Sequence, residues 1–369
     1  MPRTITVGVP VYRGAEHVGA ALRSLQEQTF ADFDAVISVD AADEESARAC
    51  EPFLDDERFS LVVQPERPDW YGNVNWLLRQ PMGEFFCYRQ HDDTTTPEFF
   101  EVLVAAARER PDAAIVYTDC QWHGGRKDLE AAPSIEGDVL SRLQQHIEQK
   151  QPVAVRGLMR RGAVEQAGPI RGDEFRGLSE VYVWLAKLLR WGAFVRIPEP
   201  LYHRLDHTGN YHKQWFDWPE ERTRGSWTTL YTGLMEATMP VCRTPEERFF
   251  FQQLILDRIA VVRPGLSYHY TPTSPHASGA LMLECLRRLD AEGKRGLLDV
   301  PDELVRGLTT ELERLRDDNR RLRRRNRRLR EERDSLESSA PGVLERARRL
   351  VRGREVDESR PGATPRGGD

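Results

Sequence analysis

Two adjacent carboxylates, Asp92 and Asp93, end an apolar run and are the clearest candidates for chemistry in this sequence. The run, Phe85–Tyr88, is typical of a buried strand, and Thr96 and Pro97 then predict the N-cap and first residue of a helix. In open α/β sheets, ligands bind outside the carboxyl ends of the strands. Neighbouring carboxylates repel each other unless a positive group holds them, and a divalent cation that carries a phosphate suits hard oxygen ligands. The alternative interpretation is a solvated acidic turn.

The elements that must position these carboxylates alternate between strands and helices, which indicates βαβ units and a largely parallel sheet. A polar stretch at 121–136 is predicted to be a mobile surface loop, and 215–300 is mainly helical by pattern. The other predicted strands are Thr4–Val9, Phe33–Val39, Phe59–Val63, Ala113–Thr118, Val153–Arg160 and Ala193–Ile197. The predicted helices are Ala15–Gln28, Glu44–Leu54, Asn73–Gln80, Pro97–Arg110 and Gly177–Trp191.

The composition excludes several classes of protein. A formal net charge of −6 over 369 residues does not favour a nucleic-acid binder by bulk charge. The five cysteines show no metal-binding or redox spacing, so we expect reduced thiols in a cytoplasmic protein. We expect neither a signal peptide, because the first residues lead directly into a strand, nor a membrane span, because no run of 18 apolar residues occurs.

The C-terminal part of the chain has a seven-residue repeat. Asn319 and Asn326 each fall four residues after a repeating leucine, which places them at heptad position a when the leucines occupy d. Asparagine at position a favours a parallel two-stranded coiled coil, so we expect a homodimer through this segment. The repeating leucines are Leu308, Leu315, Leu322, Leu329 and Leu336.

Arginine is concentrated in the same segment. Eight of the eleven residues at 320–330 are arginine. The run is either the solvated face of the coiled coil or a contact with a polyanion, such as anionic lipid at the inner face of the membrane. Val343–Val351 could form a short basic amphipathic helix, and the tail after Arg352 is predicted to be disordered. The predicted domains are an α/β domain at 1–210, a helical accessory region at 211–304, a coiled coil at 305–338, and the basic helix and tail at 339–369.

Four segments together resemble a family 2 glycosyltransferase of the GT-A fold. They are Val7–Gly14 with the sequence VGVPVYRG, Leu22–Phe30 with SLQEQT at its centre, Val39-Asp40, and His91–Asp93. The resemblance covers roughly residues 4–210. It implies a Rossmann-like mixed sheet, transfer of a sugar from a nucleotide-diphosphate donor with inversion, and assistance by Mg²⁺ or Mn²⁺.

The resemblance also implies a donor site. Asp40 would accept a hydrogen bond from the base of the nucleotide, and Asn75 matches an asparagine that lies near the donor. Gln90 stands where the metal motif of the family begins with aspartate, so the cation would depend on Asp92 and Asp93, with His207 from a later loop. The residues carried over as donor-binding are Pro10, Val11, Tyr12, Asp40, Asn75, Gln90 and Asp92, and those carried over as metal-binding are Asp92, Asp93 and His207.

Glu180 matches the position of the family's catalytic base, where aspartate is usual. A carboxylate at the start of a helix stays ionised and can take a proton. Asp173 and Glu174 are alternative bases just upstream, and Glu180 could also be an ordinary helix-terminal charge. Lys187–Trp191 lacks the glutamine of the processive synthases' Gln-x-x-Arg-Trp motif, so a non-processive enzyme is expected.

Two other functions remain open from the residues. A nucleotidyltransferase shares the sheet and the paired carboxylates, but it would need a glycine-rich basic loop after the first strand, where this chain has only Arg13-Gly14. A catalytically degenerate scaffold would work through the coiled coil. For the glycosyltransferase, the acceptor would be a glycan or a lipid-linked molecule, and no specific nucleic acid partner is expected.

Overall fold

The computed structural model describes residues 3–149, 152–172, 180–210, 218–260, 275–298 and 300–339. The chain divides into two compact units, Met1–Pro301 and Asp302–Asp369. The predicted alternative bases Asp173 and Glu174, the predicted helix Val343–Val351 and the tail lie outside the described residues.

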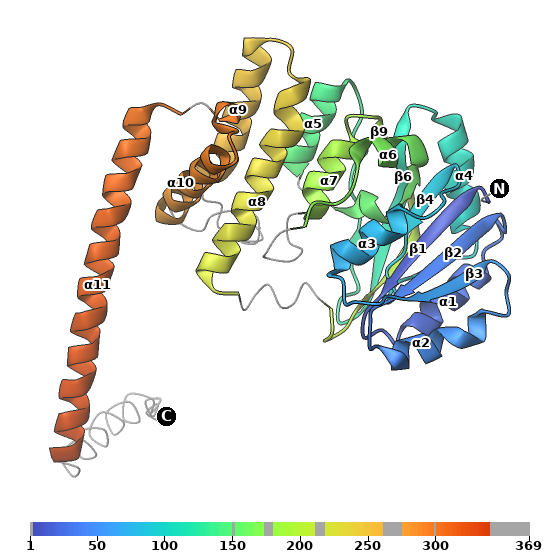
Figure 1. The fold of residues 1–369 in the computed structure, drawn as a ribbon, viewed down its shortest axis with the longest axis horizontal. Helices are drawn as coiled ribbons and strands as arrows, with labels where there is room; N and C mark the ends of the chain where they lie inside the picture. The colour runs from blue at the N-terminus through green and yellow to red at the C-terminus, as the bar shows by residue number, and fades with distance from the viewer. Residues whose placement is uncertain are drawn as a thin grey trace, which may run out of the picture. The chain divides into compact units, whose positions relative to one another are not determined.

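A mixed β-sheet is the centre of the first unit (Figure 1). Its strands follow the order β3-β2-β1-β4-β8-β6-β9-β5, and β7 pairs with β6. β8 is antiparallel to both of its neighbours, whereas β1, β2, β3 and β4 are mutually parallel and β9 runs parallel to β6. The strands are β1 (Ile5–Val11), β2 (Phe33–Val39), β3 (Phe59–Val63), β4 (Phe85–Tyr88), β5 (Thr94–Thr95), β6 (Ala113–Gly124), β7 (Leu129–Glu130), β8 (Leu158–Arg160) and β9 (Ala193–Asp206).

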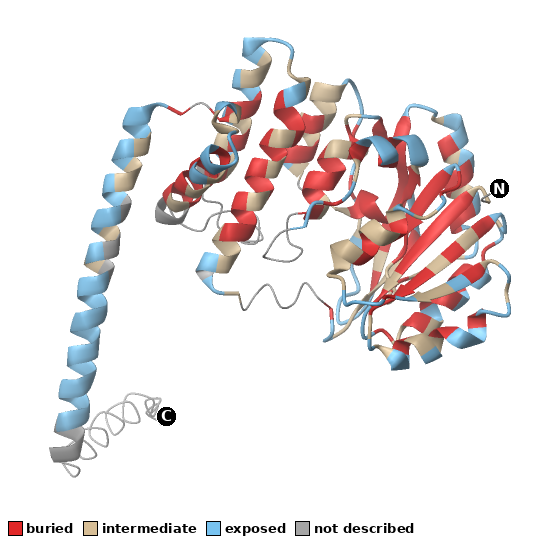
Figure 2. Cartoon of the chain, viewed as in Figure 1, coloured by how far each residue is buried: buried red, intermediate tan, exposed pale blue. Residues whose placement is uncertain are grey.

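Helices cover the sheet and form a group beside it. α3 packs against β1 and β2, α4 packs against β6 and β8, and α8 packs against α7, α9 and α10. The apolar strands and the facing sides of these helices are buried (Figure 2). The helices of this unit are α1 (Val18–Gln26), α2 (Glu44–Cys50), α3 (Trp70–Leu78), α4 (Phe99–Glu109), α5 (Val139–Gln149), α6 (Arg161–Ala167), α7 (Glu180–Leu188), α8 (Glu220–Thr238), α9 (Pro245–Ala260) and α10 (Pro275–Ala291).

Several predicted elements differ from the structure. The predicted strand at 153–160 begins as a 3₁₀ turn, Val153–Arg156, and only Leu158–Arg160 pairs in the sheet. The predicted mobile loop at 121–136 is wrong in part, because β6 continues to Gly124 and β7 pairs with it. The predicted N-cap at Thr96 is also wrong, since α4 begins two residues later, after Glu98.

The second unit contains one long helix, α11 (Asp302–Ser339), over the range where the heptads are predicted. Two of its repeating leucines, Leu322 and Leu329, are 56% and 51% exposed. Among the described residues, no helix is long and apolar enough to cross a membrane. The five cysteines are free thiols, as predicted.

Candidate active site

The carboxyl ends of β1 and β2 meet at one edge of the sheet and carry the predicted nucleotide pocket. Val11 pairs with Val39, and the Asp40 backbone N–H donates to the Val11 carbonyl at 3.0 Å. Tyr12 follows on the exposed rim. The guanidinium of Arg67 lies 4.2 Å from the centroid of its ring, which makes a cation–π contact.

Asp40 is buried at this edge and is paired with an amide. Asn73 Nδ2 donates to Asp40 Oδ1 and to the Ser38 carbonyl, each at 3.0 Å. Burial raises the pKa of Asp40, while the bond from Asn73 and the charge of Arg67, 3.9 Å away, oppose this. The carboxylate is therefore oriented by α3, and its second oxygen lies on the Arg67 side.

The side chain of Asn75, predicted to lie near the donor, is engaged elsewhere. Asn75 Nδ2 donates to the Ile170 carbonyl and Asn75 Oδ1 accepts from the Ile170 N–H, both at 2.7 Å. This pair of bonds ties α3 to the loop that follows α6. Asn73 is therefore the asparagine of α3 that reaches Asp40, and it was missed because both asparagines lie in one helical turn.

Asp92, after β4, lies against the loop that follows β9. His207 Nε2 lies 3.1 Å from Asp92 Oδ2, and Asn210 Nδ2 donates to the same oxygen at 3.1 Å. The Gly209 N–H donates to His207 Nδ1, so the neutral ring carries its proton on Nε2 and donates it to Asp92. Burial raises the pKa of Asp92, but nearby His91 and His207 outweigh it and hold that pKa below its usual range.

Asp93 belongs to a separate buried network. Its Oδ2 accepts from the Tyr202 hydroxyl at 3.0 Å, its Oδ1 accepts from the Leu205 N–H at 3.2 Å, and Arg156 Nε lies 3.7 Å away. Burial raises the pKa of Asp93, and the charge of Asp92 adds to this, against Arg156. Arg156 also donates to Gln90 Oε1 at 3.1 Å, so Gln90 lies in this network.

The predicted metal trio of Asp92, Asp93 and His207 is not assembled. Among the described residues, no group of three or more His, Cys, Asp or Glu side chains is arranged to hold a metal ion. Asp93 contacts Arg156 and Tyr202 instead of joining Asp92 and His207, because a buried carboxylate needs polar or charged partners. Asp92 and His207 together fit a divalent cation in part, since they offer a carboxylate oxygen and an imidazole nitrogen.

Glu180 is the first residue of α7 and is 2% exposed. Two contacts fix its helix from the α5 and α6 sides. His146 Nε2 lies 2.9 Å from the Tyr182 carbonyl, and Trp184 Nε1 donates to the Gly168 carbonyl at 2.9 Å. The helix start favours the ionised form of this carboxylate, whereas its burial opposes that form.

Comparison with known proteins identifies the class of protein to which this fold and site correspond. Residues 6–163 match the sequence model of the family described as Glycosyl transferase family 2. This segment belongs to that family, and it contains the strands that carry Asp40 and Asp92. The chain accordingly contains a glycosyltransferase domain; Glu180 and His207 lie beyond the matched segment.

Solved structures share the fold. The crystal structure of S. aureus TarS 1–349 in complex with UDP is 15% identical, with a TM-score of 0.56, and the match covers 85% of this chain and 92% of that one. The complex of the same protein with UDP-GlcNAc is 16% identical over the same shares, with a TM-score of 0.51. At these identities the likeness shows the GT-A fold alone.

Proposed function

We propose that the chain transfers a sugar from a UDP-sugar to a hydroxyl group of a glycan or lipid-linked acceptor, with inversion. One observation carries the proposal. Asp40, paired with Asn73, follows β2, and Asp92, bonded to His207 and Asn210, follows β4; β2 and β4 are the two neighbours of β1 in the sheet. A nucleotide-diphosphate donor needs one group that recognises its base and another that binds its diphosphate, both along one edge of the sheet. The UDP and UDP-GlcNAc complexes of TarS support uridine as the nucleotide.

In the proposed donor site, Asp40 accepts from the ring N–H of the base, and Asn73 holds the carboxylate in place for it. The Tyr12 ring, backed by Arg67, packs on the nucleotide, with Pro10 and Val11 beneath it. Asn75 serves the site indirectly by fixing the loop at Ile170.

Asp92 and His207 would hold Mg²⁺ or Mn²⁺, and the imidazole favours Mn²⁺. The cation, when bound, neutralises the charge that develops on the departing diphosphate. To bind the cation through Nε2, neutral His207 would carry its proton on Nδ1 instead, which would replace the bond that Nδ1 accepts from the Gly209 N–H. Asn210 would keep the Asp92 carboxylate oriented, as outer partners of metal ligands do.

Glu180 is the proposed base. It takes the proton of the acceptor hydroxyl while that oxygen forms a bond to the anomeric carbon, and the bond from that carbon to the diphosphate oxygen breaks. The nucleoside diphosphate leaves on the opposite face, so the configuration inverts.

The base is tested with Glu180→Gln, assayed by release of UDP from UDP-GlcNAc with Mn²⁺ and by calorimetric binding of UDP. Loss of a general base costs about 10²- to 10⁴-fold in rate, so turnover should fall by that factor while UDP binding stays unchanged. Turnover that persists in Glu180→Gln would remove Glu180 from the mechanism, and lost UDP binding would assign it a structural role. Glu165→Gln, at an exposed position of α6, is the matched control.

We also propose that α11 pairs with a second copy of the chain. A partner helix would bury the exposed leucines at heptad position d, and Asn326 at heptad position a would favour a parallel register. Across such a seam, position g of one helix faces position e of the next heptad on the other. Asp318 then faces Arg323, which attracts, whereas Arg325 faces Arg330, which repels.

The repelling pair lies within the arginine run at 320–330. A parallel dimer doubles the charge density there, and an anionic surface would relieve the repulsion. We therefore propose that this run contacts anionic lipid headgroups and brings the enzyme to lipid-linked acceptors.

A further inference from the structure

The helix that carries Glu180 packs closely on α8. Val183 of α7 is buried against Gly233 of α8, and a Cβ at position 233 would lie 2.6 Å from Val183 Cγ2 and 2.9 Å from Val183 Cγ1. Real contacts of that kind are longer, and valine is stiff at χ1, so any larger residue would push the two helices apart. Glycine weakens a helix interior, and this close approach is the reason to keep it there.

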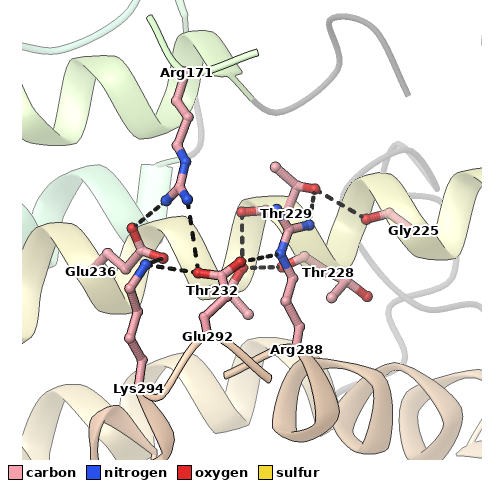
Figure 3. A network of polar contacts seen from close by, with 9 residues as sticks. All are labelled: Arg171, Gly225, Thr228, Thr229, Thr232, Glu236, Arg288, Glu292 and Lys294. Carbon is pink, nitrogen blue, oxygen red and sulfur yellow. Dashed lines mark hydrogen bonds and ion pairs between the residues drawn. The ribbon is translucent and has the colours of Figure 1, made fainter. Parts of the chain in front are cut away.

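The loop before α7 is tied to the same helical region by an ion-pair network (Figure 3). Arg171 Nη1 lies 2.8 Å from Glu236 Oε2 on α8, and Arg171 Nη2 lies 3.8 Å from Glu292 Oε2, just after α10. Lys294 Nζ joins both acids, at 3.0 Å to Glu236 and 2.7 Å to Glu292. Arg171 of the loop is thereby linked to α8 and to the residue that follows α10.

The network continues into α8, and its charge acts on α7. Arg288 Nε lies 3.1 Å from Glu292 Oε1, and Arg288 Nη1 donates to Thr229 Oγ1 at 2.7 Å. Burial lowers the pKa of Lys187 on α7, and the charge of Glu236 opposes this. Glu236 and Glu292 are only 19% and 26% exposed, so these pairs are screened less than surface ion pairs.

The same loop contacts the donor side of the site. Ile170 is bonded to Asn75 of α3, and a Cβ at Gly172 would lie 2.0 Å from the Tyr71 ring. Residues 168–172 therefore connect α3, which orients Asp40 through Asn73, with α7 and with α8.

We infer that α8, together with Glu292 and Lys294 after α10, is the positioning device for the base. It contacts α7 at Gly233 and the loop before α7 at Arg171. This region sets the place of Glu180 relative to the donor, so its residues control turnover without touching the nucleotide. The inference rests on the proposed role of Glu180. A misplacement of about 1 Å can cost about 10²-fold in rate, so packing at this distance is sufficient to act on catalysis.

The test compares Gly233→Ala with the double variant Gly233→Ala/Val183→Ala, which removes the opposing methyl groups. The control is Gly162→Ala, an exposed helical glycine with nothing within 4 Å of an added Cβ. The readouts are kcat for UDP release from UDP-GlcNAc with Mn²⁺, the Kd of UDP and thermal melting. We expect kcat to fall at least about tenfold in Gly233→Ala with the Kd of UDP unchanged, and to recover in the double variant.

The inference is overturned if folded Gly233→Ala keeps the wild-type kcat, or if the Kd of UDP rises in step with the loss. Should that variant not fold, Arg171→Met is expected to lower kcat and Arg171→Lys to restore most of it, and equal activity in both would overturn the inference. The variant Glu180→Gln distinguishes a failure of the proposed base from a failure of the positioning role. If it retains turnover, the proposed base fails; if it abolishes turnover while Gly233→Ala and Arg171→Met do not, only the positioning role fails.

Discussion

His146 is predicted to make the protein lose stability in mild acid. Burial lowers the pKa of His146 to about 4 from an ordinary value of 6.5. Its Nε2 lies 2.9 Å from the Tyr182 carbonyl, and its buried Nδ1 has no hydrogen-bond partner. Protonation would therefore place an unpaired charge in the interior beside α7.

The sign and size follow from proton linkage. The folded pKa is depressed, so below the ordinary pKa the unfolded chain binds a proton that the folded chain does not. Stability therefore falls as the pH drops through about 6.5 and levels off below about 4. Between pH 7.5 and pH 5, the two pKa values give a loss of about 2 kcal/mol.

The assay is urea unfolding of the wild type and His146→Gln at both pH values. Glutamine keeps an amide donor for the Tyr182 carbonyl and does not titrate. The difference between the two free energies of unfolding should change by about 2 kcal/mol, with the wild type losing more on acidification. A difference that stays constant from pH 7.5 to pH 5 would refute the reasoning.

Three further predictions follow from the donor site and α11. Asp40→Asn should weaken UDP binding, measured by calorimetry, about tenfold or more, because a hydrogen bond to a charged acceptor is lost. Unchanged affinity would mean that the uracil ring binds elsewhere. Replacing Leu322 and Leu329 by Asp should convert a dimer to a monomer in sedimentation, and a monomeric wild type would exclude the seam. Replacing Arg323, Arg324 and Arg325 by Gln should weaken binding to phosphatidylglycerol vesicles about 100-fold, at about 1 kcal/mol per charge. A wild-type protein that does not bind such vesicles would contradict the lipid contact.

Much of the sheet can be predicted from the sequence, because buried parallel strands are short apolar runs between helices. The bounds of β2 and β3 are confirmed to the residue. β9 is longer than predicted, because Pro198 and Pro200 suggest a strand end, whereas they lie at a break in the register with β6. The pattern of residue types contains no sign that pairing resumes at Tyr202.

The site is less predictable, because side-chain direction in a loop depends on contacts that are distant in sequence. Asp92 and Asp93 are neighbours, yet one meets His207 and the other Arg156. Asn73 and Asn75 are chemically identical, and only the packing of α3 decides which reaches Asp40. Arg156 has no signal in the sequence, since it becomes a partner of Asp93 only when the turn before β8 folds against β4.

Metal-dependent binding of a UDP-sugar tests the central claim most directly. UDP-GlcNAc is titrated calorimetrically into wild type, Asp92→Asn and Asp112→Asn, with and without Mn²⁺; Asp112 is a surface carboxylate paired with Arg110 and serves as the matched control. Mn²⁺ should strengthen binding to the wild type and to Asp112→Asn by at least about tenfold, and this gain should vanish in Asp92→Asn. An equal gain in all three proteins, or no binding of UDP-GlcNAc, UDP or other nucleotide sugars to the wild type, would contradict it.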